Sequence, residues 1–458
     1  MPDHRIIIDG AHVATMNATG AEFASGHVVV EDQRIVAAGP GTAPGYADTV
    51  PTERVAGAGH VLTPGLVNTH HHFYQWLTRG LAQESNLFEW LKTLYPVWAR
   101  IDEPMVYAAA RASITALLTS GCTTAADHHY VFPAGAGDLI GAEIRAAREL
   151  GIRIQAARGS MDLGASRGGL PPDFAVEDTD TALAGTERAI DAYHDPAPES
   201  MVRVSVAPCS PFTVSEELLR GAAGLARRRG VRLHTHGSET LEEEEFCAEQ
   251  FGCTPTEFLD RHDWIGGDVW LAHCVHLDDG AIRRLGETGT GVAHCPSSNA
   301  RLGTGIAPVP ELIAAGAPVG LGVDGTASNE AGQLGPEARA AVLFARARSG
   351  PAALTARQAL FAGTMGGARC LGRAAEIGSI EPGKLADLAL WRIDDAGHST
   401  IADPVAALVL GSLPPLTLLL AGGHPVVTDG RLTGGDEETI AKEAAAESRR
   451  LHTLAGLR

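Results

Sequence analysis

The segment Pro64-Gly65-Leu66-Val67-Asn68-Thr69-His70-His71-His72-Phe73 joins a short apolar run to three consecutive histidines. Its Pro-Gly pair is typical of a turn, and residues 66–69 have the apolar character of a short buried strand. Because side chains alternate along a strand, His70 and His72 are expected on one face and His71 on the other. Two imidazoles on one face suit a transition metal. A polar strand end without a ligand fits this spacing equally well, so the rest of the chain must decide.

Eight apolar, strand-like runs lie between residues 60 and 370, and amphipathic helical patterns separate several of them. The runs cover residues 62–69, 121–127, 153–157, 202–207, 231–235, 269–272, 291–293 and 319–323, and helical patterns include 105–120, 143–150 and 218–229. This number of βα repeats predicts a TIM-type (β/α)8 barrel over residues 59–370. A doubly wound open sheet is the alternative, but no Gly-x-Gly-x-x-Gly follows the first run.

The two chain ends carry shorter strand patterns. They cover residues 5–8, 27–31 and 34–38 near the start, and residues 387–391 and 425–428 near the end. Neither group buries enough apolar surface alone, so we expect residues 1–58 and 371–458 to pair in one small β-sandwich domain. The Ala/Glu/Arg-rich segment after residue 435 predicts a terminal helix that packs on the surface or at a subunit contact.

Composition and charge narrow the classes of partner. The 458 residues carry a formal net charge of −19, which argues against a nucleic-acid backbone or an anionic membrane. The first ten residues lack a secretory pattern, and no apolar run reaches the roughly 18 residues of a membrane helix. The seven cysteines are scattered without a Cys-x-x-Cys pair, which favours a reducing compartment. We expect a cytoplasmic homo-oligomer, a dimer or larger, that acts on a small molecule.

Histidines and acidic residues follow four of the predicted strands at the points where the strands end, which is where barrel enzymes place their chemistry. They are His70 and His72 after the first run, His234, His236 and Glu239 after the fifth, His273 and His276 after the sixth, and Asp324 after the eighth. One histidine at a strand end is usually a satisfied core residue. Several strand ends that face one cavity predict a mononuclear metal site. Spacing alone leaves the choice between His234 and His236 open.

These motifs resemble the amidohydrolase superfamily, in its branch of nucleobase and triazine deaminases. The resemblance covers nearly the whole chain and rests on Asn68-Thr69-His70-His71-His72, His236-x-x-Glu239, Ala272-His273-Cys274-Val275-His276-Leu277, Asp324-Gly325-x-x-Ser328-Asn329 and Gly378-Ser379-Ile380-Glu381-Pro382-Gly383-Lys384-Leu385-Ala386-Asp387. It implies that four side chains hold the metal, namely His70, His72, His236 and Asp324. It also implies that Glu239 and His273 handle protons, and it favours His236 over His234.

The number of metal ions follows from the lysines. Superfamily members with two metals usually bridge them with a carboxylated lysine from the fourth strand, whereas this chain has no lysine between Lys92 and Lys384. A single divalent ion is therefore expected. Imidazoles with one carboxylate suit zinc, with iron as the alternative.

The resemblance implies hydrolytic deamination of an electron-poor ring. In this scheme Asp324 orients the attacking water, Glu239 protonates a ring nitrogen, His273 stabilises the developing oxyanion, and ammonia leaves. Gln75 and Trp90 match positions with which guanine deaminases grip the base.

Four residues are expected to bind the substrate, namely Gln75, Trp90, Tyr95 and Cys209, although Trp90 and Tyr95 would also suit simple lid packing. The segment Ala207-Pro208-Cys209-Ser210 departs from the Ala-Pro-Arg-Phe of guanine deaminases. The combination of Asn68-Thr69-His70-His71-His72-Phe73-Tyr74-Gln75 with Ala126-Asp127-His128-His129-Tyr130 most resembles 8-oxoguanine deaminases, which form urate and ammonia.

Several alternatives stay open on sequence alone. Among enzymes they are an s-triazine aminohydrolase acting on hydroxyatrazine-type rings, a guanine or isocytosine deaminase, and an imidazolone-type cyclic amide hydrolase. A catalytically inactive barrel used as a scaffold is the alternative from another class. His128 and His129 are expected either to line the pocket or to be structural, and His294 is expected to be structural.

Overall fold

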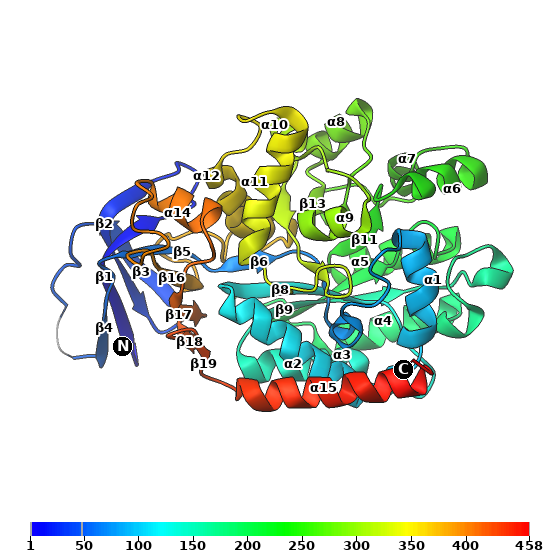
Figure 1. Ribbon diagram of the computed structural model, residues 1–458, viewed down its shortest axis with the longest axis horizontal. Coiled ribbons are helices and arrows are strands. Elements are labelled where there is room, and N and C mark those ends of the chain that lie inside the picture. The colour runs from blue at the N-terminus through cyan, green and yellow to red at the C-terminus, as the bar shows by residue number, and fades with distance from the viewer. Residues whose placement is uncertain (1, 47–48, 458) are drawn as a thin grey trace.

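The structure, a computed structural model that describes residues 2–46 and 49–457, is built around a closed barrel of eight parallel strands (Figure 1). In barrel order the strands are β6 (Leu66–Asn68), β8 (Cys122–His129), β9 (Arg153–Ser160), β10 (Val202–Pro208), β11 (Leu233–Gly237), β12 (Val269–His273), β13 (Gly291–His294) and β14 (Val319–Leu321). Each predicted run supplies one of them. The (β/α)8 barrel is therefore confirmed, and the open doubly wound sheet is wrong.

Helices connect the strands and cover the outside of the barrel. They are α1 (Leu87–Trp98), α2 (Glu103–Thr119), α3 (Leu139–Leu150), α4 (Thr179–Tyr193), α5 (Glu216–Arg229), α6 (Leu241–Phe251), α7 (Pro255–Arg261), α8 (Asp279–Thr288), α9 (Pro296–Leu302), α10 (Val309–Ala314), α11 (Gly335–Ser349), α12 (Ala356–Phe361) and α13 (Gly367–Cys370). Short helical turns are η1 (Phe73–Thr78), η2 (Ala165–Arg167), η3 (Asp173–Ala175) and the π-turn η4 (Ala362–Gly366). Side-chain caps fix where helices begin: Asp102 and Ser215 accept the N–H groups of Met105 and Leu218.

A second sheet combines both ends of the chain beside the barrel (Figure 1). Its strands form one hydrogen-bonded path, β19 (Arg431–Leu432), β18 (His424–Thr428), β17 (Leu416–Ala421), β16 (Leu388–Arg392), β5 (His60–Pro64), β1 (Arg5–Ala14), β2 (Glu22–Glu31) and β3 (Arg34–Pro40), with β4 (Thr52–Ala56) paired to β1. The ends meet where β5 pairs with β16. Helix α14 (Pro404–Leu410) lies between β16 and β17 in the chain.

The predicted strand 62–69 is divided between these two sheets. β5 belongs to the second sheet and β6 to the barrel, so the chain crosses from one to the other at Gly65. The Gly65 N–H donates to Asp387 O at 2.8 Å, and the Leu66 N–H donates to Gly121 O at 2.8 Å. A Cβ at Gly65 would lie 2.3 Å from Thr123 Oγ1, so this crossing requires glycine. The second sheet is thus bonded to the barrel just before the histidine segment.

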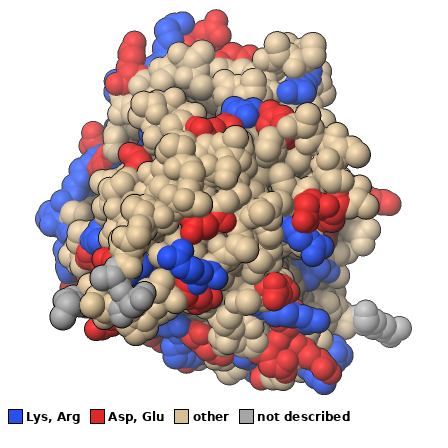
Figure 2. Space-filling view, turned by 90° about the vertical axis from the view of Figure 1, so that its left-hand side faces the viewer, with Lys and Arg blue, Asp and Glu red and all other residues tan. Residues whose placement is uncertain are grey.

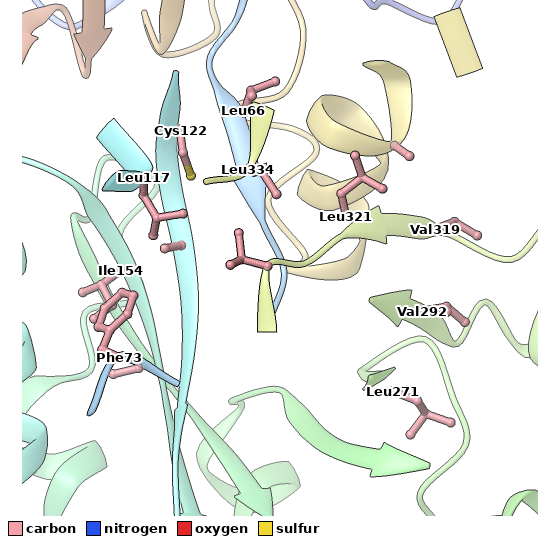
Figure 3. Close-up of a cluster of buried hydrophobic side chains, with 14 of the residues drawn as sticks. Leu66, Phe73, Leu117, Cys122, Ile154, Leu271, Val292, Val319, Leu321 and Leu334 are labelled. Atoms are coloured by element: carbon pink, nitrogen blue, oxygen red, sulfur yellow. The ribbon is translucent and has the colours of Figure 1, made fainter. Parts of the chain in front are cut away.

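The largest buried cluster lies around the barrel strands. Side chains from β6, β8, β9 and β12 to β14 contribute to it together with helical residues such as Leu117 of α2 (Figure 3). Strands β8 and β9 are buried along their entire length, as expected for parallel strands covered on both faces. This packing gives the barrel ends a rigid support.

The terminal helix α15 (Glu437–Leu454) packs against the barrel and runs alongside α2 (Figure 1). It buries Ile440, Ala444 and Leu451. Ser448 Oγ donates to Leu77 O at 2.8 Å, so the helix also supports the η1 turn that follows His72.

The end of the molecule that carries the second sheet has no continuous basic surface in the part of the chain that Figure 2 draws in colour. Blue and red side chains alternate around a broad uncharged centre. Among the described residues, no helix combines the length and the apolar composition needed to cross a bilayer.

A buried ion pair across the two sheets generates a stability prediction. Arg153 of β9 is fully buried and donates to both carboxylate oxygens of Asp387, at 3.1 and 3.4 Å, and to Ser200 O at 2.7 Å. Asp387→Ala would leave the guanidinium charge without its counterion. We expect the free energy of unfolding in urea to fall by about 3–5 kcal/mol.

The Arg34–Glu199 pair is a matched control, because it joins the same two parts of the molecule with both side chains exposed. Glu199→Ala should have little measurable effect on unfolding. Equal losses for the two variants would contradict the importance of the buried pair.

Candidate metal centre and substrate pocket

The predicted site residues converge at one end of the barrel. Beyond the barrel strands, β7 (His71–His72) pairs in parallel with β15 (Asp324–Gly325), which places Asp324 opposite His71. Two buried sets of ligand atoms share His70, and the atoms of each set lie within 4.8 Å of one another. One set adds His72, His128 and His236, and the other adds His273 and Asp324. The structure therefore brings together every side chain expected to hold a metal.

The backbone fixes the tautomers of two of these imidazoles. His72 Nδ1 lies 2.5 Å from His128 O, and His236 Nδ1 lies 2.6 Å from Cys209 O. A carbonyl oxygen can only accept, so each Nδ1 carries the hydrogen and each neutral ring presents a bare Nε2. The two Nε2 atoms face each other at 3.3 Å.

The tautomer of His70 is also fixed by a backbone carbonyl, but through the ring of His234. His234 Nδ1 donates to Trp270 O at 2.9 Å, which leaves its Nε2 as an acceptor. His70 Nδ1 donates to this Nε2 at 2.8 Å, so His70 Nε2 is also bare. The spacing left His234 and His236 undecided, and the structure gives them different places: His236 joins the ligand set, whereas His234 lies behind His70.

This donor set fits one divalent metal ion. The Nε2 atoms of His70 and His72 each lie 3.3 Å from Asp324 Oδ1. A tetrahedral site with bonds of 2.0–2.1 Å has edges of about 3.3 Å, and imidazole nitrogens with a carboxylate suit zinc. Two bare Nε2 atoms at 3.3 Å cannot hydrogen-bond to each other, so a cation between them satisfies both.

Asp324 is held by groups that sequence reasoning missed. Ser298 Oγ donates to its Oδ2 at 2.6 Å, while the Gly325 N–H donates to Oδ1 at 2.7 Å. Its backbone has a φ of +65°, and His273 has a φ of +72°, both in the left-handed region that non-glycine residues rarely adopt. The sequence feature that could have pointed to Ser298 is its position shortly after the seventh predicted strand, at the same end of the barrel.

Glu239 and His273 lie side by side next to the ligand set. His273 Nε2 is 3.6 Å from Glu239 Oε2, and its Nδ1 lies 2.9 Å from Asn299 Oδ1. Asn299, also missed from sequence, therefore fixes the hydrogen on Nδ1. Burial, with Asp324 and Glu243 nearby, raises the pKa of Glu239 well above its usual range, whereas burial lowers the pKa of His273. Both shifts favour a proton on Glu239 over one on His273.

A pocket of about 370 Å³ opens onto these residues. All four residues expected to bind substrate line it, namely Gln75, Trp90, Tyr95 and Cys209, together with Tyr130, Phe212 and Leu302, which sequence reasoning had not assigned. Trp90 Nε1 donates to Ala327 O at 3.3 Å, which orients the indole as a wall. Among the described residues, the two amide atoms of the buried Gln75 side chain have no hydrogen-bond partner.

Three further histidines separate into different environments. His128 lies in the first ligand set and stacks on His236, with its Nε2 donating to Ala207 O at 2.8 Å. His129 points elsewhere: its Nε2 donates to Val131 O at 2.9 Å, and its Nδ1 lies 2.6 Å from Glu143 Oε1. His294 is buried but does not line the pocket.

Comparison with known proteins places this site in a family. The family model described as "Amidohydrolase family" matches residues 61–423. The chain belongs to the amidohydrolase family. It is 48% identical to the 8-oxoguanine deaminase of Pseudomonas aeruginosa over 442 residues, which cover 95% of this chain and 97% of that protein.

Two further relatives extend the comparison. Hydroxydechloroatrazine ethylaminohydrolase of Pseudomonas sp. strain ADP is 36% identical to this amidohydrolase, over 96% of this chain and 94% of the relative. The crystal structure of atrazine chlorohydrolase from Arthrobacter aurescens TC1 complexed with zinc is 35% identical, with a TM-score of 0.91 over 97% of this chain and 100% of that chain. The chain is a hydrolase of carbon–nitrogen bonds, which does not support the inactive-scaffold alternative.

Substitution of His234 tests the arrangement around His70. His234→Phe keeps a ring to stack on Trp270 but removes the acceptor for His70 Nδ1. Loss of such an orienting contact typically weakens metal binding 10–100-fold. We expect this loss for Zn²⁺ in competition with a chromogenic chelator, whereas His294→Phe should leave the affinity unchanged. Equal affinities of the two variants would contradict the role of His234.

Glu143 generates a pH prediction. Burial raises its pKa to about 8, so the folded protein holds a proton that the unfolded chain loses near pH 4.5. The folded state binds more protons across this window, so its stability falls as the pH rises from about 4.5 to 8. Glu143→Gln mimics the protonated side chain and escapes this loss. In urea unfolding, the free energy of unfolding of the variant relative to that of wild type should rise by roughly 2–4 kcal/mol between pH 5 and pH 8. A difference that stays constant over this range would contradict the raised pKa of Glu143.

Proposed function

We propose that this amidohydrolase is a metal-dependent deaminase that converts 8-oxoguanine to urate and ammonia. The observation that carries the proposal is the composition of the pocket: the buried Glu239 carboxyl and the unpaired amide of Gln75 lie on its walls beside the ligand set. The 48% identity to an 8-oxoguanine deaminase over nearly the full length supports the same substrate.

The metal in this proposal is one divalent ion, zinc by the chemistry of its donors and with iron as the alternative. His70, His72, His236 and Asp324 would hold it. When bound, such an ion acts as a Lewis acid that makes hydroxide available near neutral pH. The zinc complex of the related atrazine chlorohydrolase supports this choice.

The side chains around the ligand set divide the proton transfers between them. Asp324 is anchored by Ser298, so its carboxylate can orient the attacking water. Neutral His273 has a bare Nε2 that can take a proton from this water, and the resulting imidazolium can then donate to the developing oxyanion. Glu239 can give its proton to the ring nitrogen beside the attacked carbon. As the carbon–nitrogen bond breaks, the proton that His273 took from water passes to the amino group, which leaves as ammonia. The remaining hydroxyl proton returns to Glu239, so that the ring carbon becomes a carbonyl and the acid is restored.

The pocket suits an uncharged, flat, aminated ring. Aromatic side chains of Trp90, Tyr95 and Phe212 form its walls, and none of the described residues that line it is a lysine or arginine. An anionic substituent would therefore lack a counterion. The Gln75 amide offers one donor and one acceptor, which match the N–H and C=O of a ring amide.

A hydroxyatrazine-type s-triazine is the second candidate substrate. Leu87, Leu91 and Leu302 also line the pocket and could accept N-alkyl groups. The 36% identity to an ethylaminohydrolase supports this alternative.

A substrate panel with one variant tests the proposal. Purified, metal-loaded protein is assayed for release of ammonia from 8-oxoguanine, guanine and isocytosine, and of alkylamine from hydroxyatrazine. We expect the highest kcat/KM for 8-oxoguanine. Glu239→Gln should lower kcat by about 10²–10⁴-fold, because it removes the proton donor, while metal content stays at one ion per chain.

Each measurement in this experiment has an outcome that would contradict the proposal. A higher kcat/KM for hydroxyatrazine would replace the purine substrate by the triazine. Near-normal turnover by Glu239→Gln would remove Glu239 from the proton transfer. Glu245→Gln is the matched control, since it makes the same change at an exposed position of α6 and should leave kcat unaltered.

A further inference from the structure

We propose that Glu243 is a positioning residue that holds Glu239 in the pocket by binding the backbone of the turn that carries it. The inference rests on the proposed role of Glu239 as proton donor. Glu243 itself does not line the pocket, and it lies on α6, next to α7 at the same side of the barrel (Figure 1).

The contacts of the Glu243 carboxylate define this role. One oxygen accepts the Ser238 N–H at 3.0 Å, and the other accepts the Glu239 N–H at 2.8 Å. Glu243 is fully buried, so water does not replace it as an acceptor. Both donors lie in the tight connection between β11 and α6, where Ser238 has a φ of +53°. Such a backbone conformation is costly for a non-glycine residue and persists only when its surroundings hold it.

The opposite side of the same turn is bound by the next strand connection. Ser238 O accepts the N–H groups of Val275 and His276 at 2.8 and 2.9 Å, and Gly237 O accepts the Cys274 N–H at 3.1 Å. The turn is therefore fixed between the segment after His273 and the Glu243 carboxylate. Because Glu239 and His273 face each other at 3.6 Å, these contacts set the distance between the two proton carriers.

Two other helices of this chain show that the backbone groups bound by the Glu243 carboxylate are unusual for its position in the helix. Glu243 is the third residue of α6, and glutamate or glutamine at this position normally bonds back to the N–H of the capping residue. This happens in α7, where Glu257 accepts the Thr254 N–H, and in α12, where Gln358 accepts the Thr355 N–H. In α6 the cap is Thr240, but the Glu243 carboxylate extends past it to the two preceding residues. The carboxylate thus binds the Glu239 turn in addition to its place at the start of the helix.

The test compares Glu243→Gln with Glu257→Gln, which makes the same substitution at the same position of the neighbouring helix. The glutamine amide keeps one acceptor and turns an N–H₂ group towards the second backbone N–H, so the turn loses one of its two bonds. We expect kcat for 8-oxoguanine to fall about 10–100-fold in Glu243→Gln, with KM within twofold and full metal content, because small displacements of a reacting group have effects of this size. Glu257→Gln should keep the wild-type kcat.

A double variant separates positioning from a general structural effect. If Glu243 acts through Glu239, then kcat of Glu239→Gln/Glu243→Gln equals that of Glu239→Gln alone. Multiplied losses, or a kcat of Glu243→Gln as high as that of Glu257→Gln, would overturn the proposal.

Amide hydrogen exchange gives a readout that needs no substrate. We expect the Ser238 and Glu239 amides to exchange at least tenfold faster in Glu243→Gln than in wild type, while the amides of residues 70–75 keep their rates. Unchanged exchange at Ser238 and Glu239 would overturn the proposal even if another ring proved to be the substrate. Failure of 8-oxoguanine as substrate would instead appear as inactivity of the wild-type enzyme.

Discussion

The metal site depends on hydrogen bonds that hold the Nδ1–H groups of its histidines on fixed acceptors. His72 donates Nδ1–H to His128 O of β8, and His236 donates Nδ1–H to Cys209 O just beyond β10. His70 donates to His234, which in turn donates to Trp270 O of β12. Because neutral imidazole carries one hydrogen, all three Nε2 lone pairs point inward. The barrel therefore determines the chemical form of the ligands as well as their positions. Two of the acceptors, His128 O and Trp270 O, lie on the fully buried strands β8 and β12, which hold them in place.

The same principle governs the proton carriers. Asn299 determines which nitrogen of His273 is free, and Ser298 occupies one oxygen of Asp324. Each reacting side chain thus has a neighbour that removes its alternative orientations or protonation states. The residues that react lie just after β11, at the end of β12 and on β15, whereas Ser298 and Asn299, which support two of them, both come from α9.

The sequence allowed the barrel to be predicted because eight apolar runs and their helical separators are local patterns. The grouping of His70, His72, His236 and Asp324 followed from strand ends together with a family resemblance. The division of residues 62–69 at Gly65 could not be predicted, because it depends on bonds to Asp387 and Gly121 far along the chain. Ser298 and Glu243 were missed for a related reason: a serine or glutamate near a helix start is common, and only the folded chain shows what its side chain reaches.

The contact between helix α15 and the η1 turn affects the order in which parts of the metal site are completed. Ser448 binds Leu77 O, and η1, which contains Leu77, begins directly after His72. The segment after His72 is thus braced by a helix that lies 371 residues further along the chain, and Asp324 is also synthesised long after His70. A nascent chain that stops short of Asp324 therefore lacks the carboxylate of the donor set. Until Asp324 is added, its histidines can meet an ion only as an incomplete site.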